Sequence, residues 1–131
     1  MRGRSGGTLS SMAAKDERGR SGEQRAAQYL SEAGYTVLAR NWRCAFGEID
    51  IVALRGEEVV IVEVKSRRSD AYGHPFEAVD AQKRARLWRL STTWAAAHPA
   101  AARGRRLRVD IIGVTGRDTA TARIEHLEDV R

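Results

Sequence analysis

Two acidic segments of the sequence are separated by a short apolar stretch that contains one glycine. The first segment contains Asp50, and the second contains Glu63 and Lys65. If the stretch between them folds as a β-hairpin, the two carboxylates and the lysine converge on one face. Carboxylate oxygens are ligands for hard divalent cations, and an ammonium group can stabilise negative charge on a phosphate. These are the groups that a metal-dependent phosphodiesterase needs.

The register of this hairpin follows from its turn. Residues 48–54 and 58–65 are rich in β-branched side chains, and Gly56-Glu57 suits a type II′ turn, which prefers glycine at its first central position. In that register Asp50 faces Glu63, and opposed Cβ atoms lie about 4.5–5.5 Å apart. A three-residue turn would move Asp50 out of line with Glu63. The same face pairs Leu54 with Val59, Val52 with Ile61 and Glu48 with Lys65, and the opposite face carries Ile49, Ile51, Ala53, Val60, Val62 and Val64.

Two interpretations of the paired acids remain open from the residues alone. Neighbouring carboxylates in an apolar wall repel each other and lose hydration, so they require a cation. That cation is either a bound metal ion or the side chains of Lys65 and Arg67, which would make an ordinary ion-pair cluster.

The elements that must position these residues predict an α/β fold. A helix is expected over residues 16–33, where Ala26, Ala27 and Leu30 recur at helical spacing and Glu23 shares their inward face. Strand 35–42 precedes the hairpin, a polar loop spans 66–76, a second helix spans 77–98, and strands 106–114 and 122–127 follow. The order α-β-β-β-α-β-β predicts a mixed sheet flanked by helices, in a single domain over residues 16–131. Residues 1–15 are expected to be a disordered basic tail.

The net charge favours a polyanionic partner. The chain of 131 residues has a net charge of +6, and residues 1–20 contain five basic and two acidic residues. Arg67, Arg68 and Lys83 are candidate contacts to a nucleic-acid backbone, although a lysine on a helix is also typical of a solvated face. Further basic residues gather at Arg84, Arg86 and Arg89, and at Arg103, Arg105, Arg106 and Arg108.

Other features restrict the compartment and the remaining polar residues. No apolar run approaches the roughly 20 residues of a membrane span, so no membrane partner is expected. The single cysteine, Cys44, excludes an intramolecular disulfide and fits a reducing, cytoplasmic location. Asp110 stands in an apolar strand and is expected to be a buried acid with an unidentified partner. The histidines lack metal-ligand spacing and are expected in surface or capping positions; they are His74, His98 and His126.

Several segments together resemble a known bacterial family. They are residues 22–30, 40–43, 47–52, 62–67, 77–79 with Lys83, and 108–112. In order and spacing they resemble the small YraN-type proteins, which are identified as members of the PD-(D/E)XK nuclease superfamily and are similar to archaeal Holliday-junction resolvases. The similarity extends over residues 18–127. Ile49 stands where many members of the superfamily have a proline, and this departure removes no ligand.

The resemblance implies a restriction-endonuclease-like core and a specific site. Asp50 and Glu63 would bind Mg²⁺ or Mn²⁺, together with the backbone near Val64 and with Glu23, and Lys65 would be the motif lysine. The implied activity is hydrolysis of nucleic-acid phosphodiesters by a metal-activated water, with branched or structured DNA as a candidate substrate. A homodimer is the oligomeric state to test.

Two alternatives remain, because one fold hosts many functions. The first is a non-catalytic nucleic-acid-binding module, which needs the basic surface but not the acids. The second is a small interaction or assembly subunit in which the acidic hairpin is only an internal ion-pair cluster.

Overall fold

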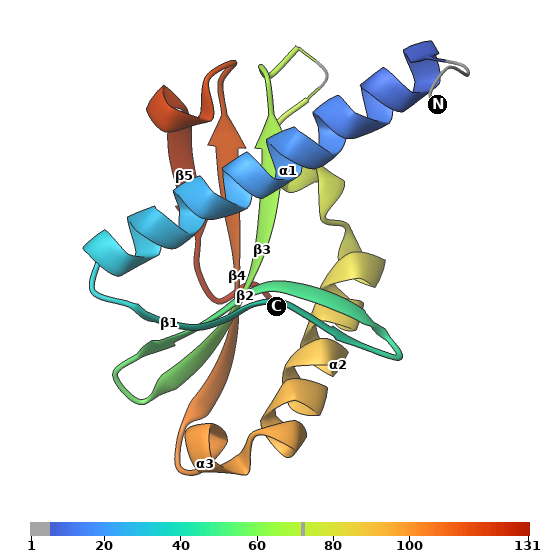
Figure 1. Ribbon diagram of the computed structural model, residues 1–131. Coiled ribbons are helices and arrows are strands. Elements are labelled where there is room, and N and C mark those ends of the chain that lie inside the picture. The colour runs from blue at the N-terminus through green and yellow to red at the C-terminus, as the bar shows by residue number, and fades with distance from the viewer. Residues whose placement is uncertain (1–5, 72) are drawn as a thin grey trace.

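A five-stranded mixed sheet carries one long helix on each face (Figure 1). The computed structural model describes residues 6–71 and 73–131, with side chains from residue 17 onward. The elements are α1 (Gly6–Glu32), β1 (Thr36–Cys44), β2 (Gly47–Arg55), β3 (Glu58–Arg67), the 3-10 helix η1 (Pro75–Ala78), α2 (Ala81–Ala97), α3 (Pro99–Ala102), β4 (Arg106–Thr115), the 3-10 helix η2 (Thr119–Thr121) and β5 (Arg123–Leu127). The predicted α/β class and the order α-β-β-β-α-β-β are confirmed.

The strands lie in the order β1-β2-β3-β4-β5. Only β3 and β4 are parallel, and the crossover between them passes through η1 and α2. The hairpin register is confirmed from the turn as far as Ile51 and Val62, with Leu54 paired to Val59 and Val52 to Ile61. The predicted pairing of Glu48 with Lys65 was wrong, because the backbone pairing of the two strands ends before it and Lys65 instead pairs with Glu63. Gly56 has a φ of 60° at the first central turn position, the conformation that favours glycine there.

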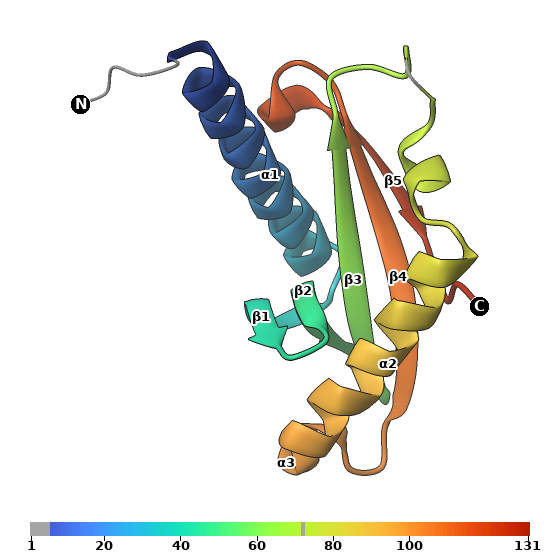
Figure 2. The ribbon, with the colours of Figure 1, turned by 90° about the vertical axis from the view of Figure 1, so that its right-hand side faces the viewer.

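Each helix buries an apolar stripe against one face of the sheet (Figure 2). On one face Ala26, Ala27 and Leu30 of α1 lie on Ile51, Ala53, Val60, Val62, Ile112 and Val114. On the other face Leu87, Leu90 and Trp94 of α2 lie on Val52, Val59, Ile61, Val109 and Ile111. Burying one such aliphatic side chain contributes about 1.5–3 kcal/mol, so the two layers hold the central strands from both sides.

The prediction for Ile49 was wrong. Ile49 was expected on the face of Ile51, but it packs in the α2-side cluster with Val52 and Leu90. Strict alternation holds only while a strand stays in the plane of its sheet. Backbone pairing of β2 with β3 stops at Ile51 and Val62, and β2 continues beyond this point paired only with β1.

The helix boundaries differ from the predicted ones. Helix α1 begins at Gly6, so it includes residues 6–15, which were expected to be disordered; residues 1–5 lie outside the described part. Ala13 and Ala14 have high helix propensity, and a helix held by packing at one end extends at little cost. Helix α2 begins at Ala81, because Asp80 caps it by accepting a hydrogen bond from the backbone N–H of Lys83 at 2.9 Å. In the described part of the chain, no helix is long and apolar enough to cross a membrane.

Candidate functional site

The candidate site lies where β2 and β3 separate. Asp50 and Glu63 are the next residues after the last backbone pair of this hairpin. Beyond them β3 continues beside β4, whereas β2 leaves the sheet with β1, and this hairpin projects between α1 and α2 (Figure 2). The side chains at the separation point therefore border space on both sides of the sheet.

Asp50 is held at this point by the backbone of β3. The N–H of Val64 donates to Asp50 Oδ2 at 2.8 Å, so the carboxylate replaces the backbone acceptor that β2 no longer supplies. Burial, followed by the charge of Glu63, raises the pKa of Asp50 from 3.8 to about 8; the bond from Val64 opposes this rise, and Glu23 and Glu48 add to it. Asp50 is thus a carboxyl group whose surroundings disfavour its charged form.

Glu63 and Lys65 form an ion pair on the same strand. Lys65 Nζ lies 2.9 Å from Glu63 Oε2, and both side chains are more than four-fifths buried. Lys83 lies beside Lys65, and the charge of Lys65 lowers the pKa of Lys83. Lys83 is therefore a half-buried member of the site, although its position on a helix also suggested a solvated face. The structure brings together the two predicted acids, Lys65, and two of the predicted phosphate contacts, Lys83 and Arg67.

Glu23 reaches the site from α1 and is positioned by a residue that the sequence analysis did not single out. Asn41 Nδ2 donates to Glu23 Oε1 at 2.7 Å. Arg40 pairs with Ile51 and Trp42 with Ile49, so Asn41 lies beside Asp50 on the neighbouring strand. Asn41 also has a φ of 54°, a left-handed conformation that asparagine tolerates better than most residues. The sequence indicated a role for Asn41 only through its place in the family-like segment 40–43. The strand pattern there did not predict a left-handed backbone at this residue.

A glycine lets α1 approach β3 closely at this level. A Cβ atom on Gly22 would lie 2.9 Å from both Cβ and Oγ of Ser66. Ser66 directly follows Lys65, and Gly22 directly precedes Glu23. The close contact therefore fixes the distance between the helix-borne acid and the acids of the sheet.

The site is a notch that opens on both faces of the sheet. Toward α2 a hollow of about 270 Å³ is lined by Gly47, Glu48, Asp50, Glu63, Lys65, Lys83, Arg86, Leu87 and Leu90. Toward α1 a hollow of about 420 Å³ is lined by Arg18, Gly19, Glu23, Asp50, Glu63, Val64, Lys65, Ser66 and Arg67. Asp50, Glu63 and Lys65 line both hollows.

The donors in the notch suit a hard divalent cation, but they are not assembled as a complete metal site. Over residues 17–71 and 73–131, whose side chains are described, no three acidic, histidine or cysteine side chains converge as a ready set of ligands. Glu63 is paired with Lys65, Glu23 with Asn41, and Glu48 with Arg43 at 3.4 Å. A cation held by Asp50 and Glu63 would need water to complete its shell, as Mg²⁺ sites usually do. It would also relieve the repulsion that raises the pKa of Asp50, and in this respect the residues fit it.

The predicted basic residues divide into two groups. Arg67 lines the α1-side hollow, whereas Arg68 is exposed and lines neither hollow. Arg108, which the sequence placed in a basic cluster with Arg103, Arg105 and Arg106, is not available to a polyanionic partner. This residue is buried and bonds Asp110 and Glu58, which leaves its guanidinium enclosed by carboxylates.

Asp110 has a structural environment on the sheet. It is 0% exposed and accepts hydrogen bonds from Arg108 and the backbone N–H of Asp129. Its Oδ2 also lies 2.7 Å from His126 Nε2, and His126 Nδ1 lies 2.8 Å from the Tyr29 hydroxyl. Burial alone would raise the pKa of Asp110, but the bonds from His126 and Arg108 outweigh it and hold this pKa below its usual value. The expected surface or capping role was therefore wrong for His126, whereas His74 caps η1 and His98 ends α2.

Comparison with known proteins identifies the family. Residues 22–114 match the family described as "Uncharacterised protein family UPF0102". The chain belongs to the UPF0102 family. It is 50% identical to a UPF0102 protein of Paenarthrobacter aurescens over 119 residues, which cover 91% of this chain and 97% of that one. It is also 51% identical to a UPF0102 protein of Arthrobacter sp. over 119 residues, covering 91% and 99%, and 44% identical to one of Frankia casuarinae over 116 residues, covering 88% and 97%. The YraN-type family expected from the motifs is thereby confirmed, and the matched UPF0102 region includes Asp50, Glu63, Lys65 and Glu23.

Proposed function

We propose that this UPF0102 protein is a metal-dependent endonuclease of the PD-(D/E)XK type that hydrolyses phosphodiester bonds of nucleic acid, in the first place DNA. The observation that carries the proposal is the cluster of Asp50, Glu63 and Lys65 at the point where two central strands separate, open to both faces of the sheet. The free Cys44 fits action in the cytoplasm. Branched or structured DNA is a candidate substrate.

Each side chain of the notch has a role in this chemistry. Asp50 and Glu63 would hold Mg²⁺ or Mn²⁺, and Glu23, oriented by Asn41, would support the ion from α1. When bound, the metal would supply Lewis-acid activation and offset negative charge at the phosphate. Lys65, released from Glu63 once a cation is bound there, would place its ammonium group against the phosphate oxygens as their charge increases. Lys83 adds a second positive charge beside it.

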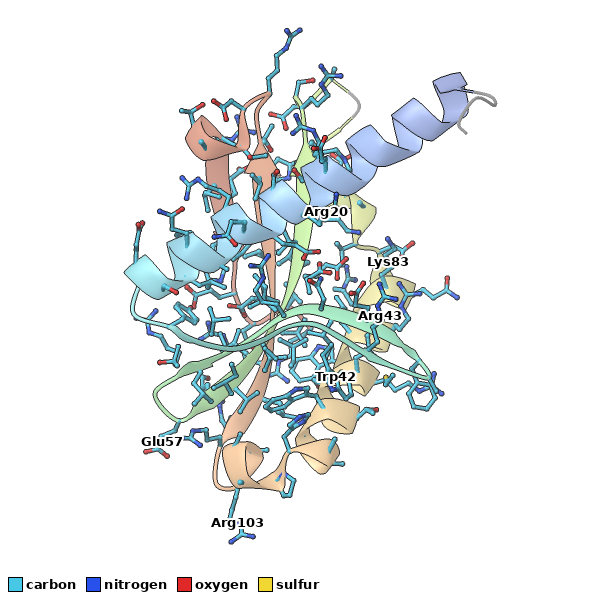
Figure 3. The ribbon with its side chains drawn as sticks, viewed as in Figure 1. Arg20, Trp42, Arg43, Glu57, Lys83 and Arg103 are labelled. Atoms are coloured by element: carbon cyan, nitrogen blue, oxygen red, sulfur yellow. The ribbon has the colours of Figure 1, made fainter. Side chains whose placement is uncertain are left out.

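The test is cleavage of labelled branched, flapped and single-stranded DNA in Mg²⁺ or Mn²⁺ by the wild type and by the variants Asp50→Ala and Glu63→Ala. We expect metal-dependent cleavage by the wild type and loss of cleavage in both variants. Glu57→Ala is the matched control, because it removes an exposed carboxylate at the turn of the same hairpin (Figure 3). Undiminished cleavage by both the Asp50→Ala and the Glu63→Ala variant would contradict the proposal.

One observation favours a second candidate, a non-catalytic nucleic-acid-binding module. Glu63 and Glu23 already have partners within the protein, and no complete set of metal ligands is assembled in the described part of the chain. Such a module would cut none of these substrates. Its binding to DNA would persist in a chelator and in the Asp50→Ala variant.

A further inference from the structure

Three cations follow one another along the exposed side of α2 and lead to the notch. Lys83, Arg86 and Arg89 recur every three residues, and we call them the α2 basic strip. They border a hollow of about 700 Å³, together with Asp80, Gln82 and Ala85. Lys83 and Arg86 also line the hollow that contains Asp50 and Glu63. The two hollows therefore share Lys83 and Arg86 as lining residues. Figure 3 labels Lys83 on α2.

An exposed aromatic ring lies at the far end of the strip. Phe46 belongs to the turn between β1 and β2, and its 47% exposure is the highest among the large apolar side chains of the described residues. The guanidinium carbon of Arg89 lies 4.6 Å from the centroid of its ring. Burial of an aromatic ring is favourable, so a partner that covers Phe46 would gain affinity from this contact.

The combination of cations with an exposed aromatic ring indicates the class of partner. Lys and Arg bind the phosphates of nucleic acids whatever the base sequence. An exposed aromatic ring contributes binding energy by stacking on a base. The bases of a duplex are already stacked on one another, so only a single strand offers a base to Phe46. A second copy of this chain is a poor partner, because a two-fold contact through this face would oppose two rows of cations.

We propose that the α2 basic strip and Phe46 form a binding path for single-stranded nucleic acid, with one base stacked on Phe46 and the backbone running along α2 toward Asp50. The direction of the path rests on the proposed function, whereas the binding itself does not. At 1.5 Å per residue the strip spans about 9 Å of helix, which is enough for two or three phosphates. Each phosphate contact to a single strand contributes about −0.7 to the slope of log K against log salt. The strip should therefore contribute about −1.4 to −2.1 to this slope.

The experiment measures fluorescence anisotropy of labelled oligo(dT), oligo(U) and blunt duplex DNA at several salt concentrations, in a chelator so that nothing is cut. The wild type should bind the single strands more tightly than the duplex, and the two oligomers separate DNA from RNA. The Phe46→Ala variant should lose about tenfold in affinity for single strands, as removal of one stacked base predicts, and should bind duplex unchanged. The Phe46→Trp variant should retain single-strand binding.

The cations are tested by the double variant Arg86→Ala with Arg89→Ala. Its salt slope for single strands should be shallower by about 1.4. The matched control is Arg103→Ala with Arg117→Ala, which removes the same charge from exposed residues outside the notch and should leave the slope unchanged. Leu38→Ala, which trims another exposed apolar side chain, is the control for Phe46.

Three results would overturn the binding path. The first is that the wild type does not bind single strands. The second is that the Phe46→Ala variant binds the single strands and the duplex with the same affinities as the wild type, and the third is that the wild type is a dimer and the Phe46→Ala variant a monomer. The last result would assign Phe46 to a contact between copies. The outcome is separable from that of the proposed function. If the wild type binds single strands through Phe46 but never cuts DNA in Mn²⁺, the nuclease proposal is refuted and the binding path is retained. If cleavage occurs but is unchanged by substitutions at Phe46 and in the α2 basic strip, the binding path is refuted and the nuclease proposal is retained.

Discussion

Replacing Asp50 by asparagine should stabilise the protein, and the gain should increase with pH. The folded-state pKa of Asp50 is raised from 3.8 to about 8, so between these values the folded protein binds the proton more tightly than the unfolded chain does. The stability of the wild type must therefore fall as the pH rises through this range. An asparagine has no charge to lose, and its side-chain oxygen can still accept the N–H of Val64.

The size of the effect follows from the pKa difference. One pKa unit corresponds to about 1.4 kcal/mol, so the wild type can lose at most about 2.7 kcal/mol relative to D50N between about pH 5 and about pH 7. Asp50 is half-buried, and water at the open notch screens part of the repulsion. We therefore expect a pH-dependent gain of about 1–2.5 kcal/mol for D50N, or roughly 4–10 °C in Tm for a domain of this size.

Urea denaturation of the wild type and D50N across this pH range measures the difference directly. Glu57→Gln is the control, since it removes an exposed carboxylate at the other end of the hairpin, and its stability difference from the wild type should not change with pH. Adding Mn²⁺ near neutral pH should raise the Tm of the wild type and leave that of D50N unchanged. A stability difference between D50N and the wild type that is the same at pH 5 and pH 7 would show that burial and the charge of Glu63 do not raise the pKa of Asp50.

Further substitutions test the supports of the site. Asn41→Ala should destabilise the protein by about 1–2 kcal/mol, because alanine is strained at the φ of Asn41, and Asn41→Gly should destabilise it less. Both substitutions release Glu23 and should therefore reduce the rise in Tm that Mn²⁺ causes. An undiminished rise in both variants would contradict the positioning role of Asn41. In thermal melts Gly22→Ala should be less stable than Gly19→Ala, because a Cβ at Gly22 meets the sheet at 2.9 Å and one at Gly19 meets nothing within 4 Å, and equal melting temperatures would count against the close contact. Asp110→Asn should lower the free energy of unfolding by about 3 kcal/mol in urea, because it removes the fully buried one of the carboxylates that pair with the guanidinium of Arg108. Since the pKa of Asp110 is depressed, its contribution is present above the unfolded-state pKa and should fade as the pH falls below about 4, and a D110N deficit that persists unchanged in acid would contradict this.

The hairpin was predictable because its information is local. A glycine at the first turn position and alternating β-branched residues fix the register, and the register places Asp50 and Glu63 next to each other at the end of the pairing. Glu23 was placed on the inward face of its helix by the same local periodicity. The positions of these three acids could therefore be predicted without knowledge of the tertiary structure.

What the sequence could not predict depends on long-range geometry. The separation of β2 from β3 after Ile51 turns Ile49 toward α2, and no pattern within β2 indicates this change. Asp110 finds Arg108 two residues away but reaches His126 only because β5 pairs with β4. Lys83 joins Lys65 because the crossover lays α2 against one face of the sheet, a placement that helical periodicity alone does not specify.

The central claim is that Asp50 and Glu63 bind a divalent cation. The most direct measurement is an anomalous difference map from crystals soaked in Mn²⁺, recorded for the wild type and for D50N. We expect a peak between the two carboxylates in the wild type, with Lys65 displaced from Glu63, and no peak in D50N. A wild-type map with no peak between Asp50 and Glu63, while Lys65 keeps its bond to Glu63, would contradict it.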